Sequence, residues 1–368
     1  MRILFISHQA NRSGAPFALL QELKHICRYC DDIQPVVLLL ATGELESEFR
    51  SLCPTIYWNS FWLRFIRKLR IDCLLKKLFP IDCIYANSIV SFDVALLIKQ
   101  RLNCPLIIHT HESDSYLKRF IKSAESLKIV DGFVTVSEFS KRCLVRQFDV
   151  LDSKVYIQRP FSPWVVKAIE DATYKSPIGK TNNEFVIGNI CNGTWQKAPE
   201  LIAIVVNLFF KKYPDANCIF KIAGIGKENE AYYHILYDLE RMCLLDKVNL
   251  MGRVENPLDC YPYFNVFLLL SREDSFPLVA EEAALSRLPI VGFDNATGAT
   301  EWIKDGCGLL VPYLDLDALV DTLYTLYANE ELRKKLGNHA KCVIEKMYHE
   351  ESQMKNVIKV LQAVVQPQ

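Results

Sequence analysis

The chain lacks several features that would assign it at once to a large class of proteins. It has no excess of either charge, since 43 Lys and Arg residues balance 43 Asp and Glu residues, and charged residues make up only 23% of its 368 positions. We therefore expect no nucleic-acid partner. Half of the residues are hydrophobic, which excludes a disordered or fibrous protein. A chain of this length is expected to form two globular domains rather than one.

Long hydrophobic runs are also missing. The chain begins MRILFISH, whose apolar stretch has the length of a strand and is too short for a signal peptide or a membrane-spanning helix. The 13 cysteines are odd in number and scattered singly, which predicts reduced, buried thiols and a cytoplasmic protein. Cys27 and Cys30 form the one CxxC motif, with no second pair at zinc spacing, so no metal site and no cofactor are expected.

The sequence does contain a regular alternation of short β-rich runs and amphipathic stretches of helical length, which is typical of parallel sheets in α/β proteins. The first series of expected strands comprises Ile3 to Ser7, Pro35 to Leu40, Cys83 to Asn87, Leu106 to His109, Phe133 to Ser137 and Val155 to Gln158. The second series comprises Phe185 to Ile190, Cys218 to Ala223, Val248 to Met251, Val266 to Ser271, Ile290 to Phe293 and Leu309 to Val311. Each series predicts one doubly wound, Rossmann-like domain.

A polar segment separates the two series. Ser176 to Glu184 reads SPIGKTNNE, and its Pro, Gly and paired Asn residues are typical of a linker. We place the domain boundary near Thr181, which gives domains of residues 1–180 and 181–368. The last segment, Glu350 to Val365, has helical periodicity with no strand after it, and it is expected to form a terminal helix of the second domain.

Ligands of open parallel sheets bind beyond the carboxyl ends of the strands, so the residues after each apolar run are candidates for a site. After the first run, Ser13 and Gly14 precede a helix and offer backbone N–H groups to an anion, although Gly14 is equally explained as a turn residue. After the fourth run, His111 and Glu112 lie in the segment HTHESD. A histidine there is able to donate a hydrogen bond or exchange a proton near neutral pH, although a surface-loop histidine is the alternative.

The segment from Val266 to Glu301 carries the strongest functional pattern. It predicts a strand, an acidic loop, a helix, a second strand and a Gly-containing loop that ends in an acid. We expect Ser275 to cap the helix, with Pro277 in its first turn. Free backbone N–H groups would then face an anion such as a diphosphate. These groups belong to Phe276, Leu278 and Val279.

Four acidic residues lie in this segment with one repeated spacing. Asp274 and Glu282 are eight positions apart, and Glu273 and Glu281 repeat that spacing one residue earlier. One acid of each pair precedes the expected helix and the other lies within it, so a pair is able to hold hydroxyl groups of a sugar and of a ribose at the same time. A solvated helix face would also explain the acids, but it would leave the neighbouring Ser, Pro and Gly residues unexplained.

At these residues the chain resembles glycosyltransferase family 4, the retaining transferases of the GT-B type. SREDSFPLVAEEAALSRLPIV is similar to the family's acidic E-x7-E region, with Asp274 and Glu282 in the two motif positions. GNICNGTWQKAPELI is similar to a segment whose Lys, here Lys197, contacts the donor diphosphate, and MGRVENP to a loop that meets the nucleotide base near Val254. In the first half, SHQANRSGAP, IYANS, HTHE and VTVSEFSKR resemble the family's Gly loop, an Asn-containing strand end, the cleft His and a Ser-containing strand end.

The resemblance implies a GT-B enzyme of two Rossmann-like domains that face a cleft. It implies metal-independent transfer of a sugar, with retained configuration, from a nucleotide-sugar donor to a glycan, lipid-linked or other acceptor in cell-surface polysaccharide or glycoconjugate synthesis. No side chain is assigned as a nucleophile.

The resemblance also implies roles for individual residues. Lys197 would neutralise the departing diphosphate, Asp274 would bind sugar hydroxyls, Glu282 would bind the ribose, and His111 would hydrogen-bond near the reacting centre. The further donor-binding residues are Val254, Ser275, Phe276, Pro277, Leu278, Val279 and Glu281. The acceptor side is assigned to Ser13, Gly14, Asn87, Glu112, Gly298 and Glu301.

Some positions depart from the family pattern. Asn192 stands where many members have an Arg five residues before the diphosphate Lys, and Ala198 replaces the usual Gly after it. A loop that is often Gly-Gly reads Thr297 and Gly298, with Glu301 retained. These changes concern the phosphate-binding region and the acceptor side.

A basic amphipathic segment lies in the first half of the chain. Trp62 to Phe79 has six basic residues, one acid and apolar positions at helical spacing, which is typical either of an interfacial helix or of a helix packed on the sheet. The first half also carries more Lys and Arg than Asp and Glu. Peripheral contact with the anionic inner face of a membrane that bears a lipid-linked acceptor is therefore one expectation.

Three other functions remain open on the sequence. A sugar-nucleotide 2-epimerase shares the architecture and the type of donor. The sequence, however, shows no general acid and general base that would act on a ring carbon of the sugar. A phosphorylase-like enzyme would need a pyridoxal-binding Lys and a far longer chain. A catalytically silent nucleotide-sugar-binding protein would keep the cleft glycines without needing Lys197, Asp274 and Glu282 together.

Overall fold

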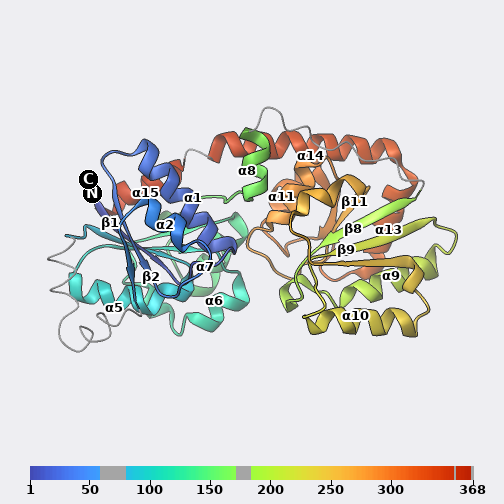
Figure 1. The fold of residues 1–368 in the computed structure, drawn as a ribbon, viewed down its shortest axis with the longest axis horizontal. Coiled ribbons are helices and arrows are strands. Elements are labelled where there is room, and N and C mark those ends of the chain that lie inside the picture. Colours follow the sequence, from blue (N-terminus) through green and yellow to red (C-terminus); the bar gives the residue numbers. More distant parts are fainter. Residues whose placement is uncertain (59–79, 171–183, 352–353, 366–368) are drawn as a thin grey trace. The chain divides into compact units, whose positions relative to one another are not determined.

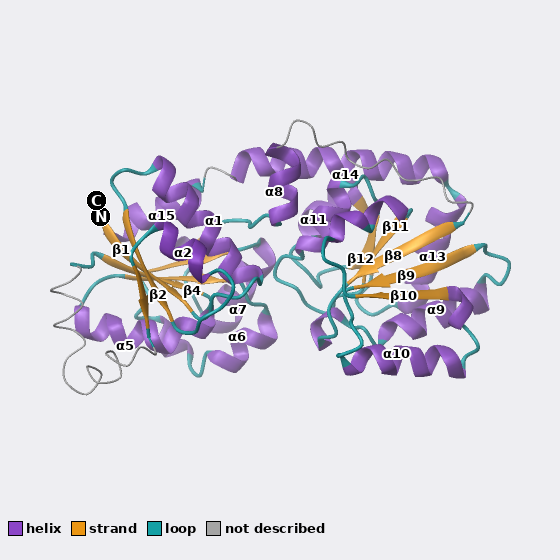
Figure 2. Ribbon diagram, viewed as in Figure 1, coloured by secondary structure: helices purple, strands orange, loops and turns teal. Residues whose placement is uncertain are grey.

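The computed structural model describes residues 1–58, 80–170, 184–351 and 354–365. Contacts divide the chain into two compact units. The first unit is Met1–Pro160 with Glu351–Gln368, and the second unit is Phe161–Glu350. Each unit contains one parallel sheet with helices packed against it (Figure 1, Figure 2). The predicted α/β class with two doubly wound sheets is therefore confirmed.

The first unit is built on a seven-stranded sheet with the order β3-β2-β1-β4-β5-β6-β7, in which all neighbours are parallel. Its strands are β1 (Arg2–Ser7), β2 (Gln34–Leu39), β3 (Thr55–Tyr57), β4 (Cys83–Asn87), β5 (Leu106–Thr110), β6 (Gly132–Thr135) and β7 (Val155–Ile157). Its helices are α1 (Gly14–Tyr29), α2 (Glu46–Leu52), α5 (Phe92–Leu102), α6 (Asp114–Phe120), α7 (Glu138–Phe148) and α15 (Lys355–Val365). The six predicted strands are present, and β3 was not predicted because three residues are too few to show a pattern.

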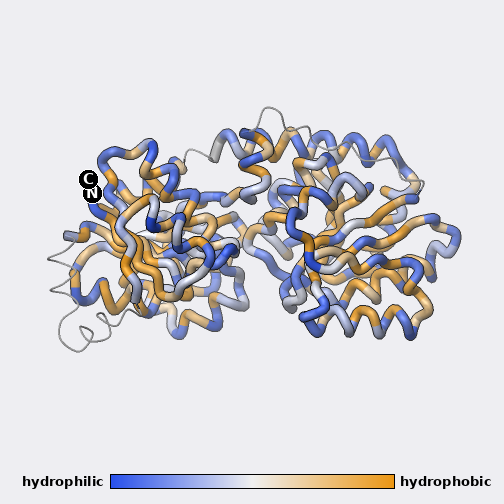
Figure 3. The backbone as a smooth tube through the Cα atoms, viewed as in Figure 1, coloured by the Kyte–Doolittle hydropathy of each residue, from blue (hydrophilic) through white to orange (hydrophobic). Residues whose placement is uncertain are grey.

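Both faces of the first sheet are buried. In β1, Leu4 and Ile6 join a core with residues of α5, α6 and α7, whereas Ile3 and Phe5 join a core with residues of α1, α2 and α15. Successive side chains of a strand point to opposite faces, so a strand covered on both sides must be apolar throughout. The strands accordingly stand out as hydrophobic segments (Figure 3). This two-sided burial is the reason that short continuous apolar runs marked the strands in the sequence.

The second unit has a six-stranded sheet with the order β10-β9-β8-β11-β12-β13. Its strands are β8 (Phe185–Ile190), β9 (Cys218–Ala223), β10 (Val248–Gly252), β11 (Val266–Leu269), β12 (Ile290–Phe293) and β13 (Gly308–Val311). Its helices are α8 (Pro163–Glu170), α9 (Leu201–Lys212), α10 (Glu230–Arg241), α11 (Leu278–Leu285), α12 (Thr300–Trp302), α13 (Leu316–Ala328) and α14 (Glu330–Glu351). All six strands of the second predicted series are present, within two residues at each end.

The structural units differ from the predicted domains of residues 1–180 and 181–368. The segment around Thr181 lies outside the described residues, and α8, which precedes it, belongs to the second unit. Helix α15 was expected in the second domain, but it packs on β5, β6 and β7 of the first unit (Figure 1). Its buried residues Val357, Val360 and Leu361 complete the core on one face of that sheet. Helical periodicity identifies an apolar face but does not say which sheet that face will cover.

The cysteines that the structure describes are free; most are buried, whereas Cys27, Cys243 and Cys342 are exposed. No helix among the described residues is long and apolar enough to cross a membrane. The basic segment from Trp62 to Phe79 lies outside the described residues.

Candidate active site

Some candidate residues of each unit follow strands that flank the point where the strand order reverses. In the first unit this point lies between β1 and β4, and in the second unit between β8 and β11. Loops that leave neighbouring strands at such a point diverge to opposite faces of the sheet and leave room for a ligand between them. The loops after β8 and β11 carry Lys197 and Asp274, and Asn87 ends β4.

In the second unit, Lys197 and Asp274 form an ion pair between Nζ and Oδ2. Lys197 ends a short 3-10 helix, Trp195–Lys197, and the two side chains are 24% and 14% exposed. The next residue, Ala198, has a φ of 52° and a ψ of 48°, a left-handed conformation that favours glycine. The glycine usual at this position in the resembling family therefore has a structural reason, and Ala198 adopts the same conformation with some strain.

The loops after β11 and β12 are tied together at Asp274. The backbone N–H of Asp274 donates to Ala296 O at 3.1 Å, and the N–H of Gly298 donates to Asp274 O at 2.9 Å. A β-bridge joins Asp274 and Thr297. Gly298, which was expected on the acceptor side, is thus placed beside the backbone of Asp274. Glu301 follows in α12 and is half-buried.

The expectation that Ser275 caps α11 was wrong. The helix begins at Leu278, and its N-cap is Pro277, which has extended backbone angles (φ −74°, ψ 102°) and provides no side-chain cap. Pro277 therefore precedes the helix instead of forming its first turn. Leu278 and Val279 do open the helix, where backbone N–H groups have no partner within the helix itself, so they remain able to face an anion.

Glu282 lies in α11 and is 4% exposed. Its carboxylate accepts hydrogen bonds from Ser162 Oγ and, at 2.9 Å, from Tyr261 OH. Burial raises the pKa of Glu282 to about 7, although both hydroxyl groups act to lower it. A carboxylate has about four lone-pair sites, and these two hydroxyl groups occupy two of them.

Glu281 has a different environment from its neighbour. It is 0% exposed, and its Oε2 accepts the backbone N–H of Ser162 at 3.0 Å. Burial raises the pKa of Glu281 well above its ordinary value. A carboxyl in this position is not on a surface that a nucleotide sugar reaches. The burial of Glu281 and Glu282 also excludes the reading of these acids as a solvated helix face.

In the first unit, hydrogen bonds determine the tautomer of His111. Asn87 Nδ2 donates to Ala15 O at 2.9 Å, and Asn87 Oδ1 lies 2.7 Å from His111 Nε2. A carbonyl oxygen only accepts, so the amide orientation of Asn87 is fixed and His111 Nε2 must be the donor. Burial holds the pKa of His111 well below its ordinary value. The ring is therefore neutral, and its Nδ1 is left as a hydrogen-bond acceptor.

The other first-unit candidates have mainly local partners. The Glu112 carboxylate accepts from Ser88 Oγ, from Ile89 N at 3.1 Å and from His111 N at 2.9 Å, so it orders the loop that carries His111. Ser13 accepts a hydrogen bond from Gln9 Nε2 at 3.3 Å. A Cβ atom added to Gly14 would meet nothing within 4 Å, so the protein itself does not require glycine there.

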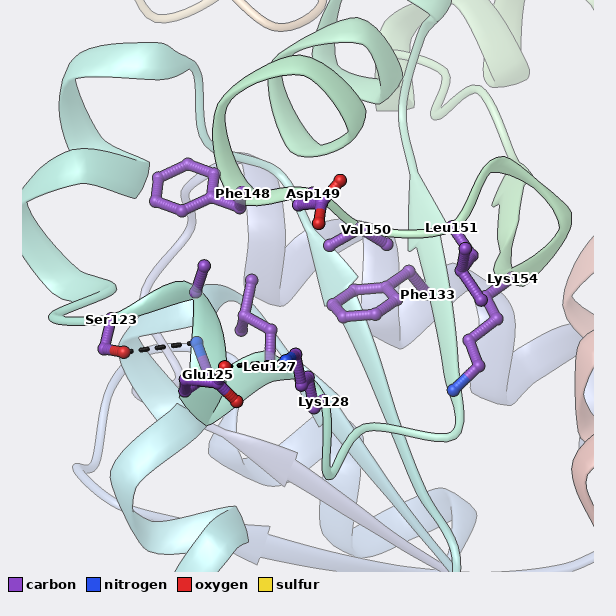
Figure 4. Close-up of a pocket in the computed structure, with 11 residues that line it drawn as sticks. Ser123, Glu125, Leu127, Lys128, Phe133, Phe148, Asp149, Val150, Leu151 and Lys154 are labelled. Atoms are coloured by element: carbon purple, nitrogen blue, oxygen red, sulfur yellow. Dashed lines mark hydrogen bonds and ion pairs between the residues drawn. The ribbon is translucent and has the colours of Figure 1, made fainter.

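Two cavities are lined by residues other than these candidates. In the first unit, a cavity of about 450 Å³ opens at the opposite, amino-terminal edge of the sheet, beside Phe133 and Lys154 (Figure 4). In the second unit, a cavity of about 430 Å³ lies beyond β8 and β9. Its lining includes three acids, which disfavour a diphosphate; they are Glu200, Glu228 and Glu230. Among the described residues, no group of three His, Cys, Asp or Glu side chains is arranged to hold a metal ion.

Comparison with known proteins identifies the family. Residues 32–160 match a family model described as Glycosyltransferase Family 4, and residues 171–343 match a model described as Glycosyl transferases group 1. The chain belongs to glycosyltransferase family 4. It is accordingly an enzyme of the glycosyltransferase class.

Relatives and solved structures cover most of this glycosyltransferase. An uncharacterized glycosyltransferase of Haemophilus influenzae is 23% identical over 76% of this chain and 73% of its own length. A Campylobacter jejuni GalNAc-alpha-(1->4)-GalNAc-alpha-(1->3)-diNAcBac-PP-undecaprenol alpha-1,4-N-acetyl-D-galactosaminyltransferase is 24% identical over 93% of both chains. Anabaena HepE, solved with UDP and glucose, has a TM-score of 0.72 at 17% identity, over 97% of this chain and 99% of HepE. These comparisons confirm the predicted GT-B fold.

The sequence did not predict the residues that contact and position Glu282 and His111. Ser162 and Tyr261 donate hydrogen bonds to the Glu282 carboxylate. Glu22 and Tyr85 contact His109, whose ring packs against that of His111. Ser162 is 120 positions from Glu282, and no local motif surrounds either hydroxyl. Such partners are recognisable only from the folded chain.

Proposed function

We propose that the second unit binds the nucleotide-sugar donor through Lys197, Asp274, Glu282 and the amino end of α11. The observation that carries this proposal is the contact between Lys197 and Asp274, which brings a cation and a carboxylate together where the strand order reverses. In the free enzyme the two side chains neutralise each other. A donor diphosphate would take the place of Asp274 as the partner of Lys197, and Asp274 would then bind hydroxyl groups of the sugar.

In the proposed mechanism, Lys197 stabilises the negative charge that develops on the departing nucleoside diphosphate. Asn192 stands where many members of the family have an Arg, so Lys197 supplies a larger share of the positive charge that stabilises the diphosphate. Glu282 binds the ribose, held in position by Ser162 and Tyr261. On the acceptor side, His111 Nδ1 accepts a hydrogen bond from a hydroxyl group near the reacting centre. The proposed stereochemical outcome is retention of configuration, with no side chain as a nucleophile.

The donor base is the first property to measure. Since HepE was solved with UDP, uridine diphosphate sugars are the leading candidates. Thermal denaturation should be followed with UDP, GDP, ADP and their sugar conjugates in the presence of EDTA. A ligand at 100 times its Kd stabilises the folded state by about 2.7 kcal/mol. For a unit of this size that corresponds to a rise of about 5 to 10 °C in Tm.

The outcomes of this experiment distinguish the functions. A rise with one class of nucleotide supports the donor site and names the base. Absence of any rise, at millimolar concentration and after addition of magnesium, would contradict the donor site. Binding without turnover would indicate a silent nucleotide-sugar-binding protein, and formation of an epimerised nucleotide sugar without transfer would indicate an epimerase.

We further propose that the acceptor is a glycan, free or lipid-linked, and that the enzyme contacts the anionic inner face of a membrane. The name of the Campylobacter jejuni relative includes an undecaprenol-linked glycan, and the basic segment from Trp62 to Phe79 has the composition of an interfacial helix. Sedimentation with vesicles tests the second part. Binding to anionic vesicles at low salt and not to neutral ones is expected, and no binding to either would refute membrane contact.

A further inference from the structure

A buried polar cluster lies next to His111 in the first unit, and the proposed function does not use it. It consists of Glu22 on α1, Tyr85 on β4 and His109 on β5, and we call it the Glu22 cluster. The three residues are 2%, 0% and 1% exposed. His109 Nδ1 lies 3.1 Å from Glu22 Oε1 and 2.8 Å from Tyr85 OH. The cluster therefore joins one helix and two strands by way of a single imidazole nitrogen.

Glu22 is an unusual residue for its position. The buried face of α1 is otherwise formed by small and apolar residues, which are Pro16, Ala18, Leu19, Leu20, Leu23 and Ile26. An acid on such a face is costly unless it is paired, and an apolar side chain of similar volume would pack there without that cost. Glu22 Oε2 and His109 Nε2 are buried without a hydrogen-bond partner among the described residues. The cluster thus costs folding free energy, and packing alone does not explain why polar residues occupy these positions.

The cluster can change its protonation near neutral pH. Burial raises the pKa of Glu22 to about 7, against the opposing effects of His111 and Tyr85, and burial lowers the pKa of His109 to about 3. When Glu22 is ionised, we assign the Nδ1–H of the neutral His109 ring as the donor to the carboxylate at 3.1 Å, with the Tyr85 hydroxyl oxygen, 2.8 Å from the same nitrogen, as its second acceptor. When Glu22 takes up one proton, its own O–H donates to Nδ1, and the ring proton of His109 must reside on Nε2. One proton is gained from solvent, and His109 changes tautomer.

His109 also supports the ring of His111. The two ring centroids are 4.1 Å apart with an interplanar angle of 34°. His111 is therefore held from two directions, by Asn87 at its Nε2 and by His109 against its face. Glu22 raises the pKa of His111 by its charge, whereas His109 and His8 lower it.

Few other titratable groups act on the cluster. Among the described residues these are His8, which follows β1, and Cys83 on β4, whose charge would act on Tyr85. The pKa of His8 is lowered by burial, and the pKa of Cys83 is raised by burial. Both groups are therefore neutral near pH 7, so within the Glu22 cluster the change of charge near neutral pH is assigned to Glu22.

We propose that Glu22 is a positioning residue for glycosyl transfer: through His109 it holds the ring of His111, so the rate of transfer depends on whether Glu22 is ionised. Glu22 touches neither donor nor acceptor, and its effect is transmitted by the hydrogen bond to His109 and by the contact of the two rings. The inference rests on the proposed role of His111, because it supposes that this imidazole acts near the reacting centre.

The test is the pH dependence of transfer in Glu22→Gln. Glutamine keeps the volume but cannot ionise. We expect kcat to fall by about 10- to 100-fold, the scale of a misplaced catalytic group. The wild-type kcat profile should lose the contribution of Glu22 to the inflection near pH 7, whereas Glu282, whose pKa is also about 7, ionises in both proteins. The KM for the donor should stay the same. Asp31→Asn, in the exposed turn after α1, is the matched control and should keep the wild-type profile.

A spectroscopic measurement makes the test independent of the rate. With 15N-labelled histidine, the ring nitrogens of His109 should report a change of tautomer near pH 7 in the wild type and none in Glu22→Gln. Resonances are assigned with His109→Gln. If Glu22→Gln does not fold, Tyr85→Phe is measured instead, and it should displace the inflection because it removes one hydrogen bond to the same nitrogen.

Each outcome decides a different point. A lower kcat with an unchanged pH profile and unchanged His109 resonances means that Glu22 is only structural, which overturns the inference. His111→Ala separates the inference from the proposed function. If His111→Ala transfers sugar at the wild-type rate, the role of His111 is refuted; if it loses transfer while Glu22→Gln behaves as wild type, only the role of Glu22 is refuted.

Discussion

Replacing Glu282 with glutamine should make the protein more stable at alkaline pH while weakening its binding of the donor. Burial raises the pKa of the Glu282 carboxyl in the folded protein from an ordinary value of 4.5 to about 7. The folded state therefore holds this proton more tightly than the unfolded state. The associated stability is fully present below the unfolded pKa and is lost as the pH rises through the folded pKa. Glutamine does not ionise and avoids this loss.

The magnitude follows from the difference between the two pKa values. Each pKa unit corresponds to about 1.4 kcal/mol, so the ionised carboxylate costs about 3 kcal/mol at about pH 8 and about 1 kcal/mol at about pH 5.5. The advantage of Glu282→Gln in the free energy of unfolding should thus grow by about 2 kcal/mol between these conditions. For a unit of this size, that equals about 4 to 8 °C in Tm. Ser162 and Tyr261 retain a polar partner, because an amide oxygen accepts and an amide nitrogen donates.

Binding of the donor should change in the opposite sense. A hydrogen bond to a charged group contributes about 1.5 to 3 kcal/mol, whereas a bond between neutral groups contributes about 1 kcal/mol. Loss of the charge, with a donor amide facing a ribose hydroxyl, should raise the Kd for the nucleotide by about 2- to 30-fold.

The assay is differential scanning fluorimetry of the wild type and Glu282→Gln across the pH range, with calorimetric titration of the nucleotide. Glu240→Gln, an exposed acid on α10, is the control and should match the wild type in both measurements. If the difference in Tm between Glu282→Gln and the wild type is the same at about pH 5.5 and at about pH 8, the buried charge of Glu282 does not lower stability and the reasoning is refuted. Wild-type nucleotide affinity in Glu282→Gln would refute ribose binding by this residue.

Other perturbations probe the rest of the site. Lys197→Met should lower kcat by about 100- to 1,000-fold, the cost of one lost electrostatic contact to a developing charge, and an unchanged kcat in steady-state assays would exclude it from leaving-group stabilisation. EDTA should leave the rate of transfer unchanged, and inhibition reversed by a divalent cation would show that the reaction needs a metal. Tyr261→Phe should raise the Kd for the donor by about tenfold, because the Glu282 carboxylate loses one of its two protein partners; calorimetry measures this. Gly188→Ala should unfold the second unit at a temperature several degrees lower, since a Cβ there would lie 2.1 Å from the ring of Phe264, and an unchanged Tm would contradict the packing.

Much of the fold was predictable because its determinants are local. A strand buried on both faces is apolar along its length, so each run could be recognised without knowledge of its neighbours. The carboxyl ends of those runs indicated His111 and Asp274 as candidates, whereas Asn87 and Lys197 came from the resemblance to the family, and the roles of all four residues stay predictions. The start of α11 was misjudged because Ser275 has the chemistry of a cap, while the extended backbone of Pro277 delays the helix to Leu278.

The sequence by itself determined the class of the fold, the order of its strands along the chain and the family. Apolar runs, periodicity and motif spacing are local patterns that can be recognised in consecutive residues. The tertiary structure decided which groups touch. It paired Lys197 with Asp274, buried Glu281 beside the nearly buried Glu282, placed α15 on the first sheet, and set Glu22 against His109. These contacts join positions far apart in the chain, and their energies depend on burial and on the orientation of hydrogen bonds, which exist only after the chain has folded.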